Sequence, residues 1–409
     1  MIQREIYINK LIEYKDSPVV KILSGIRRAG KSSILMMFKD ELLKLNVPEQ
    51  NIIYIDFESL KNFTLRNHLV LYEEILHLSE NADKNQKIYI FLDELQNVES
   101  WELTIASLMK DLNCDIYITG SNSRLLSSEF ATHIAGRYVE IKVYPLSFKE
   151  FISFYRNQNL ESQKTEKELF WEYIKFGGLP AIHFMNKNEN LIWQYLTDVF
   201  NSVILKDVIE RNKIKSSEKL ISTINFIMEN IGNIFSAKSI SSFVKNQFKS
   251  FGNDMIYDFL YALESAFIIN KVKRYDIKGK EILETLEKYY IIDIGLRNAV
   301  AGFKQNDISG ILENVVYNEL LLRGYKVCIG KNENLEIDFI AERNAEKLYI
   351  QVAYLLADSS VTQREFRPLK EVRDNYRKIV LTLDDTEDFN DEGIEKKNLV
   401  EWLMDESGR

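Results

Sequence analysis

One octapeptide constrains the fold more than any other part of the sequence. Residues 25–32 read GIRRAGKS, which matches the pattern G-x-x-x-x-G-K-S. An apolar run at 19–23 precedes this segment and a stretch with helical periodicity follows at 34–38, which predicts the order strand, loop, helix. Such a loop turns its backbone N–H groups toward one point, and the helix start adds positive potential there. The sequence therefore predicts a phosphate-binding loop in an α/β fold.

The residue types within this segment suit a nucleoside triphosphate and Mg²⁺. Gly25 and Gly30 allow backbone conformations that a Cβ atom would obstruct. We expect Lys31 to reach the β- and γ-phosphates and the Ser32 hydroxyl to ligate Mg²⁺. Ser33 begins the helix and completes the set of candidate nucleotide-binding residues.

Composition narrows the class of protein further. The chain has 409 residues, of which 45% are hydrophobic, enough for two or three domains with separate cores. No apolar run approaches the roughly 20 residues that span a bilayer, and the first residues lack the apolar stretch of a signal peptide. We therefore expect a cytoplasmic protein with no membrane partner. The formal net charge of -8 argues against a protein that coats nucleic acid through bulk charge.

A second motif supplies the carboxylates that hydrolysis needs. Residues 88–94 read IYIFLDE, and their apolar run predicts a strand buried in a parallel sheet. Asp93 and Glu94 then lie at its C-terminal end, where open α/β sheets bind ligands. We expect Asp93 to hold Mg²⁺ and Glu94 to polarise the attacking water. In isolation, the segment would indicate a strand ending in a charged turn more readily than a catalytic site, but together with the phosphate-binding loop it favours catalysis.

Further strands predict other groups near the nucleotide. Segments 52–56 and 115–119 are apolar strands with helical stretches between them, which favours a right-handed parallel sheet. Ser121 or Asn122 follows the second strand and could sense the γ-phosphate. Arg137 precedes another strand and could stabilise the transition state, although its spacing fits a structural ion pair equally well.

Four segments together resemble a known family. The resemblance is to bacterial and archaeal AAA-type ATPases that carry a C-terminal domain of unknown function, and it covers nearly the whole chain. It implies a P-loop ATPase core that uses ATP, with catalytic Glu94 beside the magnesium ligand Asp93. It also matches Asn122 to a sensor and Arg137 to an arginine finger. The segments are GIRRAGKSS, IFLDELQNVESWE, ITGSNSRLLSSEFATHIAGRYVEIKVYPLSF and YIKFGGLP.

Three modules are predicted after an ATPase core at 1–150. Residues 151–215 show helical periodicity broken by FGGLP, which suggests a helical lid. Residues 216–303 read as helices followed by a glycine-centred hairpin, the pattern of a winged helix. Such a module binds DNA or proteins, and no dense basic helix is present to favour DNA.

Residues 304–409 resemble the restriction-endonuclease-like fold. In active members an aspartate, followed on the next strand by E-x-K or Q-x-K, holds a divalent metal and positions water. Asp338 matches the aspartate and Gln351 the glutamine, with Glu313 on the preceding helix as a further acidic candidate. The lysine position holds Ala353, which removes a positive charge from the face that would meet the scissile phosphate. We therefore predict a degenerate, inactive nuclease-like module.

The first functional hypothesis is a Mg²⁺-dependent ATPase that acts as a nucleotide-driven conformational switch. One alternative is an ATP-regulated, metal-dependent DNA nuclease in which another basic residue replaces the missing lysine. The other is a nucleotide-sensing scaffold that recruits a protein without hydrolysing ATP. The sequence leaves open whether Arg137 acts within its own subunit or across an oligomer.

Overall fold

The computed structural model describes residues 2–123, 134, 136–185, 188–248 and 252–405. The chain forms two compact units, the first made of residues 1–144 and 265–267 and the second of residues 145–264 and 268–409. The predicted boundary at 150 lies shortly after the end of the first unit. Within the described ranges, no helix combines the length and the apolar character that crossing a membrane requires.

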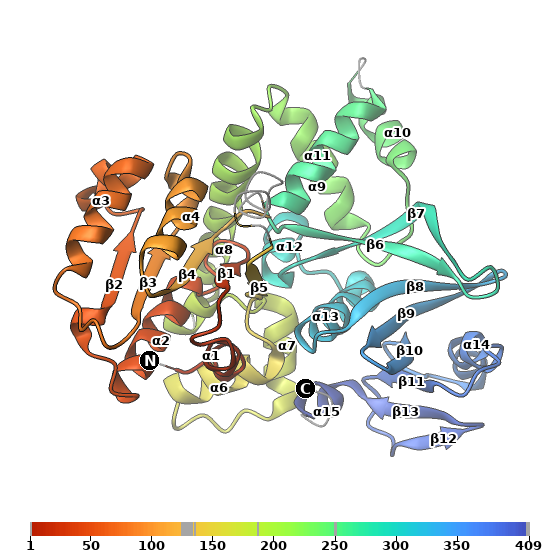
Figure 1. The fold of residues 1–409 in the computed structure, drawn as a ribbon. Coiled ribbons are helices and arrows are strands. Elements are labelled where there is room, and N and C mark those ends of the chain that lie inside the picture. The colour runs from red at the N-terminus through yellow and green to blue at the C-terminus, as the bar shows by residue number, and fades with distance from the viewer. Residues whose placement is uncertain (1, 124–133, 135, 186–187, 249–251, 406–409) are drawn as a thin grey trace. The chain divides into compact units, whose positions relative to one another are not determined.

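The first unit is built on a five-stranded sheet in which every strand pair is parallel (Figure 1). The strand order is β2-β3-β4-β1-β5, so that β4 lies between β1 and β3. Every residue of β3 is buried, as its continuous apolar run predicts for a central strand of a parallel sheet. The strands comprise Val20–Ser24 (β1), Ile52–Asp56 (β2), Ile88–Asp93 (β3), Cys114–Gly120 (β4) and Tyr138–Lys142 (β5).

Helices cover both faces of this sheet. Helices α3 and α4 pack on one face, where Ile75 and Ile105 join the apolar side chains of alternate strand positions in one core. The other face packs against α2, whose Phe38 ring centroid lies 5.0 Å from that of Tyr117 and 6.2 Å from that of Phe91. The predicted α/β core with a parallel sheet flanked by helices is therefore confirmed. The helices comprise Glu5–Glu13 (α1), Lys31–Lys44 (α2), His68–Ser79 (α3) and Trp101–Asp111 (α4), with 3-10 turns at Glu49–Asn51 (η1), Leu60–Arg66 (η2) and Leu95–Asn97 (η3).

The second unit starts with helices that begin at capping boxes. The Ser147 hydroxyl accepts a hydrogen bond from the Glu150 N–H, while the Glu150 carboxylate accepts one from the Ser147 N–H. Thr165 and Glu168 repeat this arrangement, which satisfies N–H groups that a helix start leaves free. The helices comprise Phe148–Gln158 (α6), Glu166–Phe176 (α7), Glu189–Val203 (α8), Ser217–Glu229 (α9), Ala237–Gln247 (α10), Asn253–Ser265 (α11), Ile294–Ala301 (α12), Ile308–Leu322 (α13), Ser359–Lys370 (α14) and Leu399–Met404 (α15), with shorter turns at Pro180–Phe184 (η5), Ile204–Glu210 (η6) and Gln305–Asp307 (η7).

One eight-stranded sheet runs through the second unit in the order β12-β13-β11-β10-β9-β8-β6-β7. The hairpin β6–β7 follows three helices, α9 to α11, which is the order predicted for a winged helix. Because β6 also pairs in parallel with β8, this hairpin continues the sheet of the predicted nuclease-like module. The strands comprise Ile269–Asp276 (β6), Glu281–Ile291 (β7), Lys326–Asn332 (β8), Leu335–Arg343 (β9), Glu346–Val352 (β10), Arg377–Thr382 (β11), Phe389–Asp391 (β12) and Ile394–Asn398 (β13).

The FGGLP segment ends α7 and is held by a distant aspartate. The Gly178 N–H donates to Asp293 Oδ2 at 2.7 Å, and the Leu296 N–H donates to Asp293 Oδ1 at 3.0 Å. A Cβ atom on Gly177, whose φ is +75°, would lie 2.3 Å from Asp293 Oδ1, so only glycine fits there. Burial raises the pKa of Asp293 to about 6. This motif therefore has a structural role in joining α7 to α12.

Candidate nucleotide site

The phosphate-binding loop connects β1 to α2 and depends on its two glycines. A Cβ atom on Gly25 would lie 2.2 Å from the Val143 carbonyl oxygen, so no larger residue fits without moving the backbone. Gly30 has a φ of +96° and caps the N-terminus of α2 in the left-handed region. The loop thus ends at a helix start, the arrangement that attracts phosphate groups.

Lys31 is the first residue of α2, and its side chain is turned back into the loop. Its ammonium donates to the carbonyl oxygens of Gly25 at 3.0 Å and Ile26 at 3.1 Å. It also lies 3.8 Å from Glu94 Oε1, although the two residues are far apart in sequence. The motif lysine and the predicted catalytic glutamate therefore meet at one edge of the sheet. Ser32 and Ser33 follow on the first turn of α2 and are exposed.

Asp93 ends β3 as a buried carboxylate with several hydrogen-bond donors. Its Oδ2 accepts from the Tyr54 hydroxyl at 2.8 Å, and its Oδ1 accepts from the Thr119 hydroxyl. The Ser32 side chain also hydrogen-bonds to it, which brings the two predicted magnesium ligands together. Burial raises the pKa of Asp93, while these donors oppose the rise.

Glu94 adopts an uncommon backbone conformation directly after β3. Its φ of +55° lies in the left-handed region, which costs free energy for a residue with a Cβ atom. The Glu94 N–H donates to Thr119 Oγ1 at 2.8 Å, and its Oε2 accepts from the Ser121 hydroxyl at 3.3 Å and from Gln96 Nε2. Gln96 Oε1 is buried and has no hydrogen-bond partner among the described residues. The Glu94 carboxylate is thereby held on one oxygen by Ser121, which directly follows β4, and by Gln96 of η3.

Asn122 and Arg137 lie at different edges of the sheet. Asn122 is buried two residues after β4, at the same C-terminal edge as Asp93. Arg137 precedes β5, where it is exposed and its Nε donates to the Ile134 carbonyl oxygen at 3.2 Å. Since β5 is parallel to β1, Arg137 lies at the N-terminal edge, about 20 Å along the strands from the start of the phosphate-binding loop at Gly25. An arginine side chain does not extend that far, so in this structure the Arg137 guanidinium does not lie at the phosphate-binding loop of its own chain.

Three groups at this edge were missed by sequence reasoning. Thr119 links the carboxylate of Asp93 to the backbone of Glu94, Tyr54 donates to Asp93, and Gln96 donates to Glu94. Thr119 and Tyr54 come from strands β4 and β2, where they place hydroxyl groups within mostly apolar segments. A hydroxyl group in an apolar strand was the sequence feature that could have marked these two residues.

Comparisons with known proteins agree with this geometry. The family model described as "AAA domain" matches residues 17–152, which include every residue described above at the nucleotide site. The chain is 39% identical to an uncharacterized protein of Haemophilus influenzae over 404 residues, 99% of both chains. It is 31% identical to an uncharacterized protein of Methanocaldococcus jannaschii over 410 residues, 95% of this chain and 86% of the relative. The chain belongs to their family.

The matches to known proteins extend well beyond the ATPase core. A domain of unknown function matches residues 167–307 and crosses the predicted boundaries at 215 and 303. Among solved structures, a Walker-type ATPase of Pyrococcus abyssi superposes with a TM-score of 0.53 at 17% identity, covering 73% of this chain and 96% of that chain. At this identity the similarity shows the fold alone. The chain therefore carries an AAA-type P-loop ATPase domain in an α/β fold.

The predicted nuclease-like residues also come together, in the second unit. Asp338 on β9 and Gln351 on β10 are adjacent, since the Asp338 N–H donates to Gln351 Oε1 at 3.3 Å. Glu313 lies on α13, and burial raises the pKa of both Glu313 and Asp338. Ala353, which the sequence matches to the lysine position of the nuclease-like fold, is buried.

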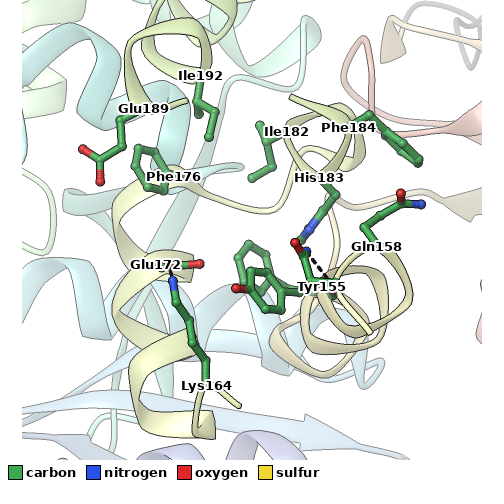
Figure 2. Close-up of a pocket in the computed structure, with 12 residues that line it drawn as sticks. Tyr155, Gln158, Lys164, Glu172, Phe176, Ile182, His183, Phe184, Glu189 and Ile192 are labelled. Atoms are coloured by element: carbon green, nitrogen blue, oxygen red, sulfur yellow. Dashed lines mark hydrogen bonds and ion pairs between the residues drawn. The ribbon is translucent and has the colours of Figure 1, made fainter. Parts of the chain in front are cut away.

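A separate hollow of about 320 Å³ lies among α6, α7, η5 and α8 (Figure 2). Lys164 and Glu172 form an ion pair on its wall. The His183 ring centroid lies 4.6 Å from that of Phe151, and burial lowers the pKa of His183 to about 4, which keeps the imidazole neutral at pH 7. None of the candidate residues predicted from the sequence lines this hollow, within the residues that the structure describes.

Proposed function

We propose that this protein is a Mg²⁺-dependent ATPase whose nucleotide state changes the conformation of the attached modules. The supporting observation is the meeting of Lys31, Asp93 and Glu94 at one sheet edge, where Lys31 lies beside Glu94 and Thr119 links Glu94 to Asp93. A sheet edge that presents a phosphate-binding loop, a buried aspartate and an adjacent glutamate has the groups that phosphoryl transfer to water needs.

The oxygen atoms at this edge suit a magnesium ion. The Ser32 hydroxyl and the Asp93 carboxylate are hard oxygen ligands, they already lie within hydrogen-bonding distance, and Tyr54 and Thr119 orient the carboxylate. When bound, Mg²⁺ would neutralise negative charge on the phosphate oxygens. Lys31 would exchange its bonds to the loop carbonyl oxygens for bonds to the β- and γ-phosphates.

We assign the role of general base to Glu94. Departure of Lys31 toward the phosphates frees Glu94 Oε1, while Oε2 stays bound to Gln96 and Ser121. Glu94 Oε1 then accepts a proton from the attacking water, and the fixed Oε2 keeps the carboxylate oriented. Asn122, buried at the same edge, is proposed as the group that senses the γ-phosphate.

Arg137 is proposed to act on the nucleotide of a neighbouring subunit. Its exposed position at the N-terminal edge of the sheet leaves it unable to reach the site of its own chain, but free to approach that of another copy. An arginine supplied from a second chain can stabilise transition-state charge strongly. This proposal makes the active ATPase an oligomer.

The attached modules are proposed to transmit the nucleotide state to a partner. The order α9, α10, α11 and then the hairpin β6–β7 supports a winged-helix interpretation, with DNA or a protein as the ligand. The net charge of -8 gives no general attraction for DNA, so DNA binding would need a local contact surface.

The test is ATP turnover by the full chain, with the variants Lys31→Ala and Glu94→Gln measured beside the wild type. Lys44→Ala is the matched control, since it removes an exposed lysine from the same helix. Loss of turnover in both site variants but not in the control supports the proposal. ATP binding without turnover by the wild type, at any protein concentration and with or without double-stranded DNA, contradicts it and favours a scaffold that only senses nucleotide.

Subunit mixing tests the proposed role of Arg137. Glu94→Gln keeps its arginine and Arg137→Ala keeps its glutamate, so a mixed oligomer contains sites with both groups intact. We expect the mixture to recover turnover that neither variant has alone. If the mixture stays as inactive as its components, Arg137 does not act across the interface.

A further inference from the structure

Four side chains of the second unit converge on one point. Glu313 comes from α13, Glu336 and Asp338 come from β9, and Lys288 comes from β7. The Lys288 ammonium lies 3.0 Å from Glu313 Oε2, 2.8 Å from Glu336 Oε1 and 3.6 Å from Asp338 Oδ1. We refer to these four residues as the Lys288 cluster. A lysine thus lies among carboxylates that include Glu313 and Asp338, both of which the sequence assigned to a degenerate nuclease site.

The Lys288 cluster is enclosed by protein. The exposed fraction of the side chain is 3% for Lys288 and 8% for Asp338, and it rises to 31% at Glu336. Lysine is almost never buried to this extent unless its charge is paired. Here three carboxylates supply the pairing, and the ammonium lies between their oxygens.

The other polar atoms expected to bind a metal are engaged by protein donors. Asp338 Oδ2 accepts from the Val352 N–H at 2.9 Å, and Glu313 Oε2 accepts from the Tyr290 hydroxyl at 3.1 Å in addition to Lys288. Gln351 Oε1 accepts from the Asp338 N–H. Among the residues that the structure describes, no group of three His, Cys, Asp or Glu side chains is arranged to hold a metal ion. The residues present therefore do not fit the divalent cation that the fold implies.

We infer that the Lys288 ammonium occupies the cation position of this cluster and excludes a divalent metal from it. The carboxylates then pair with the positive charge of Lys288. Without a bound metal at this cluster, the unit lacks the group that would activate water for phosphodiester hydrolysis. Ala353 adds no positive charge on the neighbouring strand. This inference does not depend on the proposed ATPase activity, because it concerns residues of the second unit alone.

The test measures Mn²⁺ binding to the full chain by electron paramagnetic resonance. The nucleotide-free protein carries Asp93→Asn throughout, so that the predicted magnesium ligand of the first unit is removed. The background protein is compared with three single variants, Asp338→Asn, Lys288→Ala and the charge-preserving control Lys288→Arg. The double variant Lys288→Ala/Asp338→Asn completes the set.

We expect the background protein and Lys288→Arg to show no Mn²⁺ binding that depends on Asp338. Lys288→Ala should bind one Mn²⁺ at least ten-fold more tightly than the background protein, and Asp338→Asn should abolish this gain. Mn²⁺ binding by the background protein that Asp338→Asn removes would overturn the inference. A folded Lys288→Ala protein that gains no metal would overturn it too, since the lysine would then not be the excluding group. If Lys288→Ala does not fold, the comparison of the background protein with Asp338→Asn decides the question.

A nuclease assay gives an independent outcome. Incubation of the wild-type chain with supercoiled DNA and Mn²⁺ should leave the DNA intact. Cleavage that disappears in Asp338→Ala would overturn the inference, because Lys288 would then be a basic group assisting a bound metal rather than replacing it.

Discussion

Each unit of this protein holds a lysine beside carboxylates, and the two lysines are bound in opposite ways. Lys31 donates to two carbonyl oxygens of its own loop and lies 3.8 Å from one carboxylate oxygen. Lys288 lies among three carboxylates, and the two lysine side chains are almost equally buried, with exposed fractions of 4% for Lys31 and 3% for Lys288. Carbonyl oxygens are neutral and can be exchanged for phosphate oxygens, whereas three carboxylates hold an ammonium by charge. The comparison indicates that Lys31 can exchange its protein partners for a ligand, whereas Lys288 is held by the carboxylates of its own unit.

The largest expected difference between the two lysines is in ATP turnover. Lys31→Ala should lower kcat/KM by about 100-fold or more, because it removes a positive charge aimed at the phosphates. Lys288→Ala should change turnover by less than about 2-fold if the folded protein is recovered, as it lies outside the nucleotide site. Steady-state turnover of the two variants checks this, and similar losses in both would break the distinction.

The free energy of unfolding should respond in the opposite order, with the larger loss in Lys288→Ala and the smaller loss in Lys31→Ala. Lys288→Ala leaves three carboxylates without their cation, of which Asp338 is buried and Glu313 and Glu336 are partly buried, and should lower the free energy of unfolding by about 3–5 kcal/mol. Lys31→Ala should cost about 1 kcal/mol, since Glu94 keeps its bonds to Gln96 and Ser121. Urea unfolding measures both. Lys278→Ala, which breaks an exposed ion pair with Glu333, is the control and should cost below about 0.5 kcal/mol.

A second buried charge should make the stability of the second unit depend on pH. Burial raises the pKa of Asp293 from its ordinary value of 3.8 to about 6, so the folded state holds the proton more tightly than the unfolded state. The raised pKa of Asp293 therefore contributes about 3 kcal/mol to the free energy of unfolding below pH 4. This contribution is lost as pH rises through 6. Urea unfolding between pH 4 and 7 should show this fall in the wild type and not in Asp293→Asn. Parallel pH profiles for the two proteins would rule out Asp293 as its source.

The smallest effect tests how Glu94 is oriented. Gln96→Ala removes one donor to Glu94 Oε2 and should lower kcat by about ten-fold, equivalent to about 1.4 kcal/mol, with ATP affinity unchanged. Single-turnover hydrolysis with separate ATP titrations measures the two quantities. Asn97→Ala, at the next residue of η3, is the matched control. An unchanged kcat in Gln96→Ala would mean that Ser121 alone holds the carboxylate.

The sequence predicted those features that are local in the chain. The phosphate-binding loop, the strand ending in Asp93 and Glu94, and the parallel sheet each depend on short patterns, and the fold of the core agrees with them. Thr119 and Gln96 could not be assigned, because their roles depend on where β4 and η3 meet Glu94. Such contacts depend on tertiary packing rather than on spacing.

The same limit explains the omission of Lys288. It lies on a strand that the sequence assigned to the winged-helix module, while Glu313 and Asp338 were assigned to the nuclease-like module. Only the pairing of β6 with β8 brings that hairpin into the sheet of the later strands. The sequence also marked FGGLP as a loop without indicating Asp293, which is 115 residues away from Gly178.

The strand order of the first sheet has a consequence for synthesis on the ribosome. In the described sheet β1 pairs with β4 and β5, both of which follow it by roughly a hundred residues in the chain. At about 5–20 residues per second, the strand that carries the phosphate-binding loop waits about 5–20 s for its first partner. During that interval an apolar strand is exposed to other nascent chains, so we expect newly made protein to depend on chaperones until β4 emerges.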